Sequence, residues 1–140
     1  MPFEWLEYDQ VVFINEYMID SITPSEPKGV INPNGLESAL ARGETHHHYE
    51  GEKDVFMLAA LISWSIVQNH PFANANKRTA YMVAVSFLEK HGYVSDAPSD
   101  EVQDAYVRIA NGEMNEEELA DWLRDSSYPG DGFAWQDDAE

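Results

Sequence analysis

The chain contains no cysteine and few positive charges, and each shortage excludes a class of protein. Without cysteine there is no disulfide framework, no thiolate metal site and no cysteine nucleophile. The longest apolar stretch, residues 55–67, is too short to cross a bilayer and is interrupted by Ser63 and Ser65. The first ten residues lack the pattern of a signal peptide. We therefore expect a cytoplasmic protein that does not contact membranes.

Positive charge is the scarcest property of the sequence. Eight Lys and Arg residues stand against 26 Asp and Glu residues, a formal net charge of −18. This argues against nucleic acid and anionic membranes as partners. The acid is unevenly placed: residues 96–140 hold fourteen acidic and two basic residues, whereas residues 55–88 hold no acidic residue. The only Lys or Arg residues in that acid-free window are Lys77 and Arg78, side by side.

Helical patterns dominate what remains. A length of 140 residues with 44% apolar residues suits one compact domain. Hydrophobic spacing predicts helices at about 9–20, 36–42, 52–69, 77–91, 99–112 and 115–125. The segment 52–69 is apolar nearly all round, which is typical of a helix in the middle of a bundle. The predicted fold is therefore all-α, a compact bundle of about six helices around a central apolar helix.

Single segments carry more local signals. In the first helix, Val12, Phe13 and Tyr17, with Ile19, are expected to share the buried side. The second helix is expected to stop at Gly43. The following segment ETHHHYEGE, residues 44–52, has turn character and is a candidate for a short hairpin or flap. Consecutive histidines do not share a face, so the triplet at 46–48 disfavours a metal site. The chain beyond residue 126 is expected to be loop-like.

The informative segment is HPFANANKRT, residues 70–79, which separates the two most apolar helices. If Asn76 is the N-cap, then Lys77, Arg78 and Thr79 form the first helical turn. Each cation there is disfavoured by about 0.3–1 kcal/mol, because the helix dipole is positive at that end. A bound phosphate would compensate for this. With His70 as a nearby base, the segment indicates phosphoryl or nucleotidyl transfer. A surface histidine and a solvated Lys-Arg pair remain the alternatives.

The nine residues HPFANANKR resemble the active-site loop of the Fic family, H-x-F-x-[DE]-[GA]-N-[GK]-R. The ending N-K-R resembles the death-on-curing (Doc) branch, which comprises the toxins of toxin–antitoxin pairs. GLESALAR before the loop and FLEKHGY after it are also similar to the Doc pattern, in the same order. The resemblance assigns residues 1–128 to a Fic/Doc-like domain and leaves 129–140 as an acidic, flexible tail.

The resemblance implies a role for each matching residue. His70 would be the general base and Phe72 the anchor of the loop. The phosphate-binding residues would be Asn76, Lys77, Arg78 and Thr79, with Lys77 and Arg78 also counted as catalytic. ATP would supply the phosphate, a threonine of elongation factor Tu would accept it, and translation would stop. A cognate antitoxin would be a second partner. The flap that docks the target would comprise Thr45, His46, His47, His48 and Tyr49.

Two positions depart from the family pattern. Asn74 stands where the family has an acidic residue that holds Mg²⁺, and a neutral amide is a weaker ligand for that cation. Gln68 stands where many Doc-like sequences have Arg. The resemblance therefore predicts a Doc-type protein kinase whose activity could be reduced or lost through these changes, and two alternatives to it stay open. One is a Fic-type nucleotidyl transferase (AMPylation), which Lys77 disfavours because that branch has Gly there. The other is a catalytically impaired binding or regulatory protein.

Overall fold

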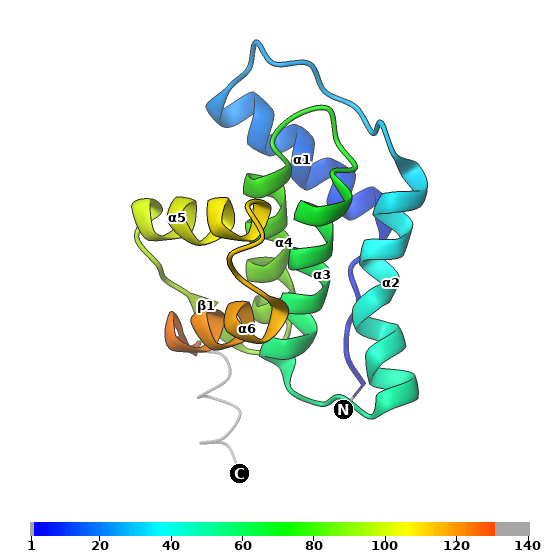
Figure 1. Ribbon diagram of the computed structural model, residues 1–140, viewed down its shortest axis with the longest axis vertical. Coiled ribbons are helices and arrows are strands. Elements are labelled where there is room, and N and C mark those ends of the chain that lie inside the picture. The colour runs from blue at the N-terminus through cyan, green and yellow to red at the C-terminus, as the bar shows by residue number, and fades with distance from the viewer. Residues whose placement is uncertain (1, 131–140) are drawn as a thin grey trace.

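The most apolar helix of the chain lies in the middle of the fold. The computed structural model describes residues 2–130, and in these α3 (Val55–Asn69) has ten buried residues. It packs against α2 (Pro33–Glu50) on one side and against α4 (Asn76–Lys90), α5 (Ser99–Ala110) and α6 (Glu116–Asp125) on the others (Figure 1). The predicted all-α bundle of about six helices around a central apolar helix is confirmed.

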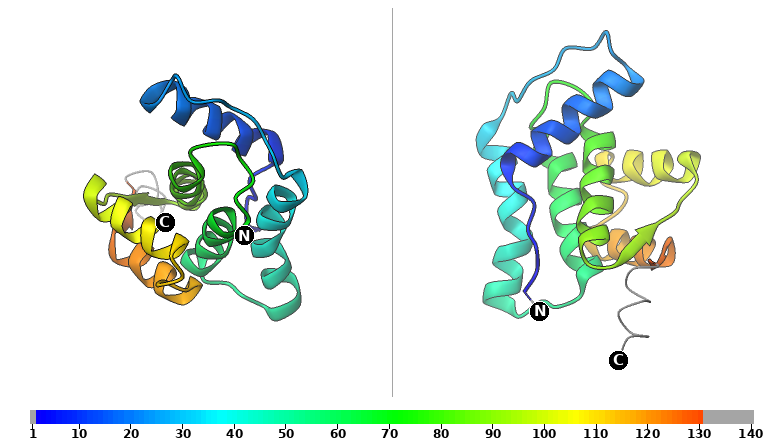
Figure 2. Two further views of the ribbon diagram at one scale, coloured as in Figure 1. Left: turned by 45° about the horizontal axis from the view of Figure 1, so that its top comes forward. Right: turned by 180° about the vertical axis from the view of Figure 1, so that it is seen from behind.

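The first helix, α1 (Tyr8–Ile22), lies across one end of the α3–α4 pair (Figure 2). The loop that joins α3 to α4 lies at the same end. A buried hydrogen bond ties the middle of the pair together, because the Ser63 hydroxyl of α3 donates to the Ala80 carbonyl of α4 at 2.6 Å. Ser63 Oγ also lies 2.6 Å from the hydroxyl of Tyr106 in α5, whose pKa is raised by burial. These contacts fix the two helices on which the loop is built.

The buried stripe of α1 differs from the predicted one. Val11, Asn15 and Ile19 are buried, whereas Phe13 is 67% and Tyr17 60% exposed. The spacing of four residues is helical, as expected, but the helix is rotated so that a polar residue lies in the apolar stripe. Ile19 is buried as predicted and Val12 is partly buried, but the prediction was wrong for Phe13 and Tyr17, because apolar character alone does not decide which face of this helix is buried. In the structure, Asn15 is buried because it meets polar partners.

The second helix does not stop at Gly43, and no hairpin or flap follows it. Residues 33–50 form one continuous helix, α2, that ends at Gly51 in the left-handed conformation, φ 72°. Gly43 is buried where α2 crosses α3, and an added Cβ would lie 3.0 Å from Ile62 Cδ1 and 3.2 Å from Trp5 Cζ3. Gly43 thus permits close packing of α2 on α3 and the N-terminal segment. The predicted helix end at Gly43 was wrong, because the glycine serves packing there and not a turn.

The sheet of the described residues is formed by other segments. Strands β1 (Tyr93–Ser95) and β2 (Ser127–Pro129) pair antiparallel, with Tyr93 opposite Pro129 and Ser95 opposite Ser127. The chain after residue 126 is therefore not all loop, and the predicted domain limit at 128 falls inside β2. The rest of the predicted tail, residues 131–140, lies outside the described residues. Within residues 2–130, none of the helices combines the length and apolarity that a membrane span requires.

Gly43→Ala tests the close packing of α2 on α3. In an open helix this change stabilises by about 0.5–1 kcal/mol. Here we expect a loss of about 1–3 kcal/mol in the free energy of unfolding, because the new methyl group overpacks Ile62 and Trp5. Urea denaturation measures the change. Ser38→Ala, at an exposed position of the same helix, is the control and should change stability by less than about 0.5 kcal/mol. A stabilised Gly43→Ala variant would contradict the packing argument.

Candidate active site

A buried aromatic side chain anchors the loop between α3 and α4 in the core. Phe72 is fully buried, and Pro71 is buried beside it. The predicted anchoring of the loop by Phe72 agrees with this position. Residues at both ends of the loop, His70 at φ 47° and Ala75 at φ 63°, adopt the left-handed conformation that turns the chain sharply. The loop is thus a tight reversal built around a buried ring.

Asn76 fixes the shape of this reversal from inside. The prediction that Asn76 is the N-cap was wrong. Asn76 is the first residue of α4 and is only 6% exposed. Its Oδ1 accepts from the Phe72 N–H at 3.0 Å, and its Nδ2 donates to the Phe72 carbonyl at 2.9 Å. The N-cap is Ala75, which has no side chain with which to cap. The main-chain N–H of residue 76 is therefore available for the predicted phosphate contact, whereas its side-chain amide is already hydrogen-bonded to Phe72.

The N-terminus of α4 is rich in free donors. Across the described part of the chain, the main-chain N–H groups of residues 75, 76, 77 and 78 have no hydrogen-bond acceptor. Lys77 is exposed and has neither an ion pair nor a hydrogen bond to any described residue. A helix N-terminus with unpaired amides and a free cation favours a bound anion. We call these four amides, with the side chains of Lys77 and Arg78, the phosphate cradle.

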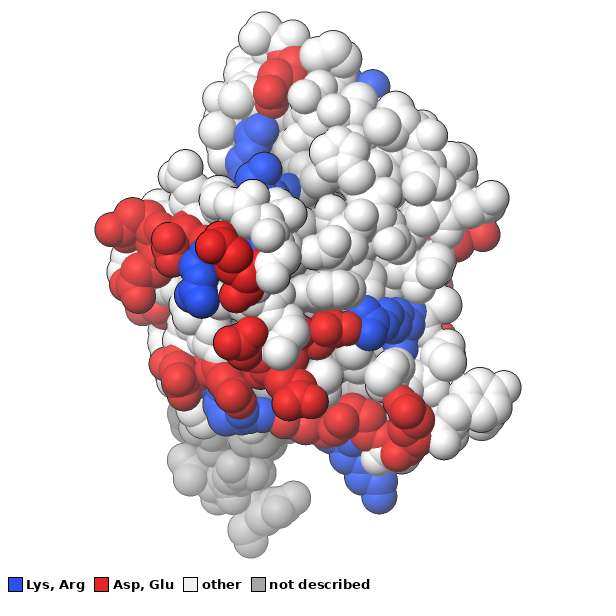
Figure 3. Space-filling view, viewed as in Figure 1, with Lys and Arg blue, Asp and Glu red and all other residues white. Residues whose placement is uncertain are grey.

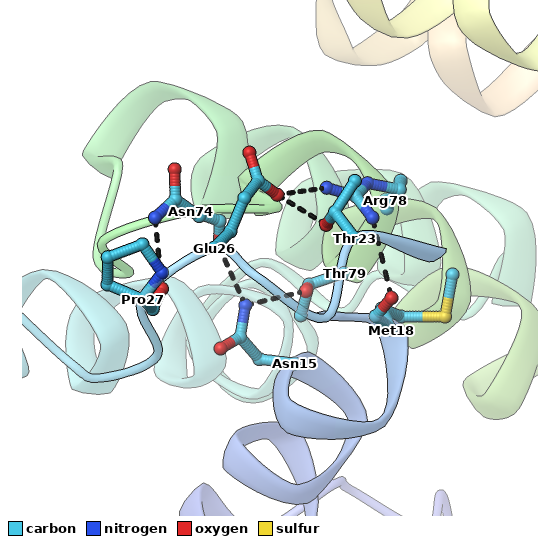
Figure 4. A network of polar contacts seen from close by, with 8 residues as sticks. All are labelled: Asn15, Met18, Thr23, Glu26, Pro27, Asn74, Arg78 and Thr79. Atoms are coloured by element: carbon cyan, nitrogen blue, oxygen red, sulfur yellow. Dashed lines mark hydrogen bonds and ion pairs between the residues drawn. The ribbon is translucent and has the colours of Figure 1, made fainter. Parts of the chain in front are cut away.

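Arg78 is held by internal partners. Its guanidinium donates to Glu26 Oε1 at 3.0 Å and to the Met18 carbonyl at 3.4 Å (Figure 4). Hydrogen bonds from the Thr23 hydroxyl and from Arg78 lower the pKa of Glu26, so its carboxylate is ionised at neutral pH. Glu26 pairs with the Arg78 guanidinium in the way that an anionic ligand would. Sequence analysis missed Glu26, because nothing in a proline-rich loop distinguishes one surface glutamate from another.

His70 lies at the other end of the loop. It is exposed, follows the last residue of α3, and has its ring 3.3–3.4 Å from Nδ2 of Asn76. Both of its ring nitrogens lie at that range, so neither is committed to a strong partner within the described residues. An imidazole with an available nitrogen can take a proton from a hydroxyl group. The loop therefore brings a base, a set of free amides and two cations to one end of the molecule.

The segment before α2 lies alongside the loop. Residues 29–32 run antiparallel to it, with the Ala73 N–H donating to the Gly29 carbonyl at 2.9 Å and the Ile31 N–H to the Pro71 carbonyl at 2.8 Å. Asn74 adds a further bond, because its Nδ2 donates to the Pro27 carbonyl at 2.9 Å. The extended chain next to the candidate site is thus residues 27–32, which the sequence showed only as a loop.

The predicted target-docking residues lie elsewhere. Thr45, His46, His47, His48 and Tyr49 belong to the last turns of α2, at the end of the bundle away from the loop (Figure 1). His46 pairs with Glu50 at 2.6 Å, and His47 Nδ1 lies 2.6 Å from the Glu52 carbonyl oxygen. The flap conformation predicted for this segment was wrong. Thr79, predicted as a phosphate ligand, is fully buried, and its hydroxyl oxygen accepts from Asn15 at 3.0 Å.

Most acidic side chains on the face shown in Figure 3 lie away from this end and gather over α5, α6 and the lower half. The end that carries the loop shows basic as well as acidic side chains, and Glu26 is one of the acids there. Gln68, at the position where Arg was expected from the family, donates to the Ile109 carbonyl at 2.9 Å and so links α3 to α5. The local positive character at the cradle therefore depends on Lys77, Arg78 and the helix amides.

The described residues do not fit a Mg²⁺ site at position 74. Among them, no group of three His, Cys, Asp or Glu side chains is placed to hold a metal ion. Asn74 offers one neutral oxygen, and its nitrogen is engaged by Pro27. Mg²⁺ in phosphate sites is normally held by carboxylates. The nearby carboxylate of Glu26 is bound by Thr23 and Arg78.

A helical bundle with this loop between its two central helices defines a Fic-type domain. The family model described as the Fic/DOC family matches residues 5–88, and the chain belongs to this family. The protein named "Protein kinase doc" of Escherichia phage P1 is 35% identical over 97 residues, which are 69% of this chain and 75% of that protein. The Doc branch expected from the N-K-R ending is thereby confirmed.

A solved structure supports the fold. The N-terminal Fic domain of a VirB-translocated Bep effector protein from Bartonella quintana superposes with a TM-score of 0.54 at 19% sequence identity. The match covers 75% of this chain and 50% of that one, so the chain spans about half the length of the protein it matches. At this identity the likeness shows a common fold and no more.

Glu26→Gln tests the paired contact of this carboxylate with Thr23 and Arg78 through its pH dependence. The lowered pKa of Glu26 in the folded protein means that its contribution to stability is present above the ordinary glutamate pKa. The contribution is lost as the pH falls through the lowered value. The difference in unfolding free energy between wild type and variant should therefore shrink in acid. Glu16→Gln, at an exposed position of α1, is the control and should give a constant difference. Parallel curves for Glu26→Gln would contradict the contact.

Asn74→Asp tests the missing metal ligand. The carboxylate loses the bond to Pro27 and gains affinity for Mg²⁺. We expect the variant, but not wild type, to be stabilised when MgCl₂ is added, by about 1.4 kcal/mol at tenfold excess over the dissociation constant. Thermal unfolding with and without MgCl₂ measures this. Gln68→Glu, which adds an acid at the end of α3, should not respond. An equal response of wild type and Asn74→Asp would show that the chain holds the ion elsewhere.

Proposed function

We propose that this chain is a Doc-type protein kinase, which transfers the γ-phosphate of ATP to a hydroxyl group of a target protein. The observation that carries the proposal is the free Lys77 in the first turn of α4, beside four unpaired amides and within one loop of His70. The resemblance of the loop to the Doc branch points to the same chemistry. The proposal concerns the activity, the substrates and the partners of the chain.

The phosphates of ATP would lie in the cradle. The amides of residues 75–78 donate hydrogen bonds to phosphate oxygens, and the helix dipole adds its positive end. Lys77 supplies a point charge, and Arg78 can supply a planar pair of donors. By the family resemblance, Lys77 stands where nucleotidyl transferases have glycine, and its side chain would take up room that the nucleotide uses there. This favours presenting the terminal phosphate over the α-phosphate for reaction.

His70 would act on the target hydroxyl. Its free imidazole nitrogen takes the proton while the hydroxyl oxygen forms a bond to the γ-phosphorus. The bond between that phosphorus and the bridging oxygen to ADP breaks, and the electron pair leaves with ADP. Lys77 and Arg78 stabilise the charge that develops on the phosphate oxygens. The products are a phosphorylated protein, ADP and the proton held by His70. No step is assigned to a metal at position 74.

Binding of ATP would require Arg78 to change partners. Glu26 holds the guanidinium in the structure, and a phosphate carries more negative charge than a carboxylate. The exchange of one anion for another leaves the cation paired in both states. The loop before α2 would then lose one of its ties to the site, because Glu26 belongs to that loop.

The partners follow the family resemblance and stay proposals. The protein substrate would be elongation factor Tu, modified on a threonine, with arrest of translation as the consequence. A cognate antitoxin would neutralise the chain. With these partners and ATP as substrate, the activity would be cytoplasmic. The chain's large negative charge is consistent with a protein partner and not with nucleic acid.

A second function is favoured by two observations at the same site. Asn74 removes the metal carboxylate, and Glu26 occupies the arginine. A Fic-fold protein that binds a partner without transferring phosphate would have both features. Nucleotidyl transfer is the third candidate, and the position of the transferred label separates it from the kinase.

Labelled ATP in cell extract tests the three functions. With the kinase, label from the γ-position appears on a protein and label from the α-position does not. His70→Asn should reduce the transfer by about a hundredfold or more, because the base is removed. Asparagine tolerates the left-handed backbone at φ 47°, so this change keeps the loop geometry better than alanine does.

The other outcomes assign the other functions. Label from the α-position on the target identifies a nucleotidyl transferase. Equal labelling by wild type and His70→Asn would exclude His70 as the base. Absence of label from both positions, with a protein captured by the folded chain, identifies the binding protein.

A further inference from the structure

A buried asparagine on α1 is hydrogen-bonded to the loop between α3 and α4. Asn15 is 1% exposed, and its Nδ2 donates to the Asn74 carbonyl at 2.9 Å and to Thr79 Oγ1 at 3.0 Å. These partners lie in the loop and in the first turn of α4, 59 and 64 residues away in sequence. Figure 4 shows the amide nitrogen directed toward both, and the amide oxygen directed away from them. Asn15 therefore joins α1 to the two parts of the chain that form the cradle.

The orientation of this amide is dictated by the loop. A carbonyl oxygen only accepts hydrogen bonds, so the Asn15 atom that faces the Asn74 carbonyl must be the nitrogen. This leaves Asn15 Oδ1 buried without a hydrogen-bond partner, the one such side-chain atom among the described residues. An unpaired buried acceptor is costly, and native proteins retain few of them. The amide is held in this orientation in spite of that cost.

The bond to Asn74 also sets the direction of the next amide. The structure contains no cis peptide bond in the described chain, and in a trans peptide the C=O and the following N–H point in opposite directions. Because Asn15 draws the Asn74 carbonyl toward α1, the Ala75 N–H points away from α1. Ala75 is left-handed, with φ 63° and ψ 31°, and the next residue begins the helix. Consecutive N–H groups in such a turn form a concave anion site.

We propose that Asn15 is a positioning residue of the phosphate cradle. By holding the Asn74 carbonyl, it turns the Ala75 N–H into line with the amides of residues 76–78, where it donates to a phosphate oxygen. The inference rests on the proposed function for the identity of the anion. Asn15 acts through Ala75, since Asn15 is buried and does not itself touch the phosphate.

The first test needs no variant. The amide resonances of wild-type, full-length protein are followed by NMR while inorganic phosphate is added. The amide of Ala75 should shift together with those of residues 76–78 and give the same dissociation constant. Shifts confined to residues 76–78 would overturn the role of Asn15, because the amide that it aims would lie outside the site.

The second test compares matched variants at constant temperature, well below unfolding. Asn15→Leu is similar in size and lacks the donor, and it should weaken phosphate binding by about tenfold or more. Ser63→Ala is the control, since Ser63 is also fully buried and hydrogen-bonded to α4 but does not contact the loop. It should leave the phosphate affinity unchanged. Equal affinities of Asn15→Leu and Ser63→Ala would overturn the proposal.

Asn15→Asp keeps the variant series informative if Asn15→Leu does not fold. It has the same shape but presents a carboxylate oxygen to the Asn74 carbonyl, so the loss of affinity should be at least as large. Retained affinity in this variant would overturn the proposal. If no wild-type amide responds to phosphate, both the cradle and the role of Asn15 fail. If phosphate binds as described but ATP gives no labelled protein, the proposed kinase fails and the inference about Asn15 stands.

Discussion

The pair of hydrogen bonds between the Asn76 side chain and the Phe72 backbone controls the geometry of the rest of the site. These bonds close the chain reversal between α3 and α4 around the buried ring of Phe72. The start of α4 is thereby held close in space to the end of α3. The first turn of α4 is then capped by an alanine that offers no acceptor. Its amides remain unpaired, so the packing of the loop leaves hydrogen-bond donors free at the start of α4. The same bonds place His70 beside Asn76 at the mouth of the reversal.

The protein carries a large net negative charge, but the start of α4 carries two neighbouring cations, Lys77 and Arg78. The acidic residues lie mainly over α5, α6 and the lower half of the face shown in Figure 3, where they are solvated. At the loop, Lys77 has no carboxylate partner among the described residues and Arg78 has one, Glu26. The single carboxylate that reaches the cradle comes from a different segment, and it neutralises the cation that a phosphate would use. Within residues 2–130, Arg78 is thus neutralised by a carboxylate of the protein itself, whereas Lys77 is not.

Much of the fold could be predicted from local patterns. The six helices of the described residues and the central position of residues 55–69 follow from hydrophobic spacing within a few turns. The errors arose where one residue type serves two purposes. Gly43 resembles a helix end but provides close packing, and Phe13 resembles a core residue but is exposed on α1. The choice depends on which surface the neighbouring helix presents, and that surface is distant in sequence.

The site divides in the same way. The sequence by itself determined the family, the candidate reactive residues His70, Lys77 and Arg78, and the absence of an acid at position 74, because all of these lie in one short segment. Only the tertiary structure decided what each group contacts. Asn15 and Glu26 come from α1 and the loop after it, and they meet the segment through hydrogen bonds that span more than fifty residues. No local pattern encodes such contacts, since they exist only once α1 lies across the end of the α3–α4 pair.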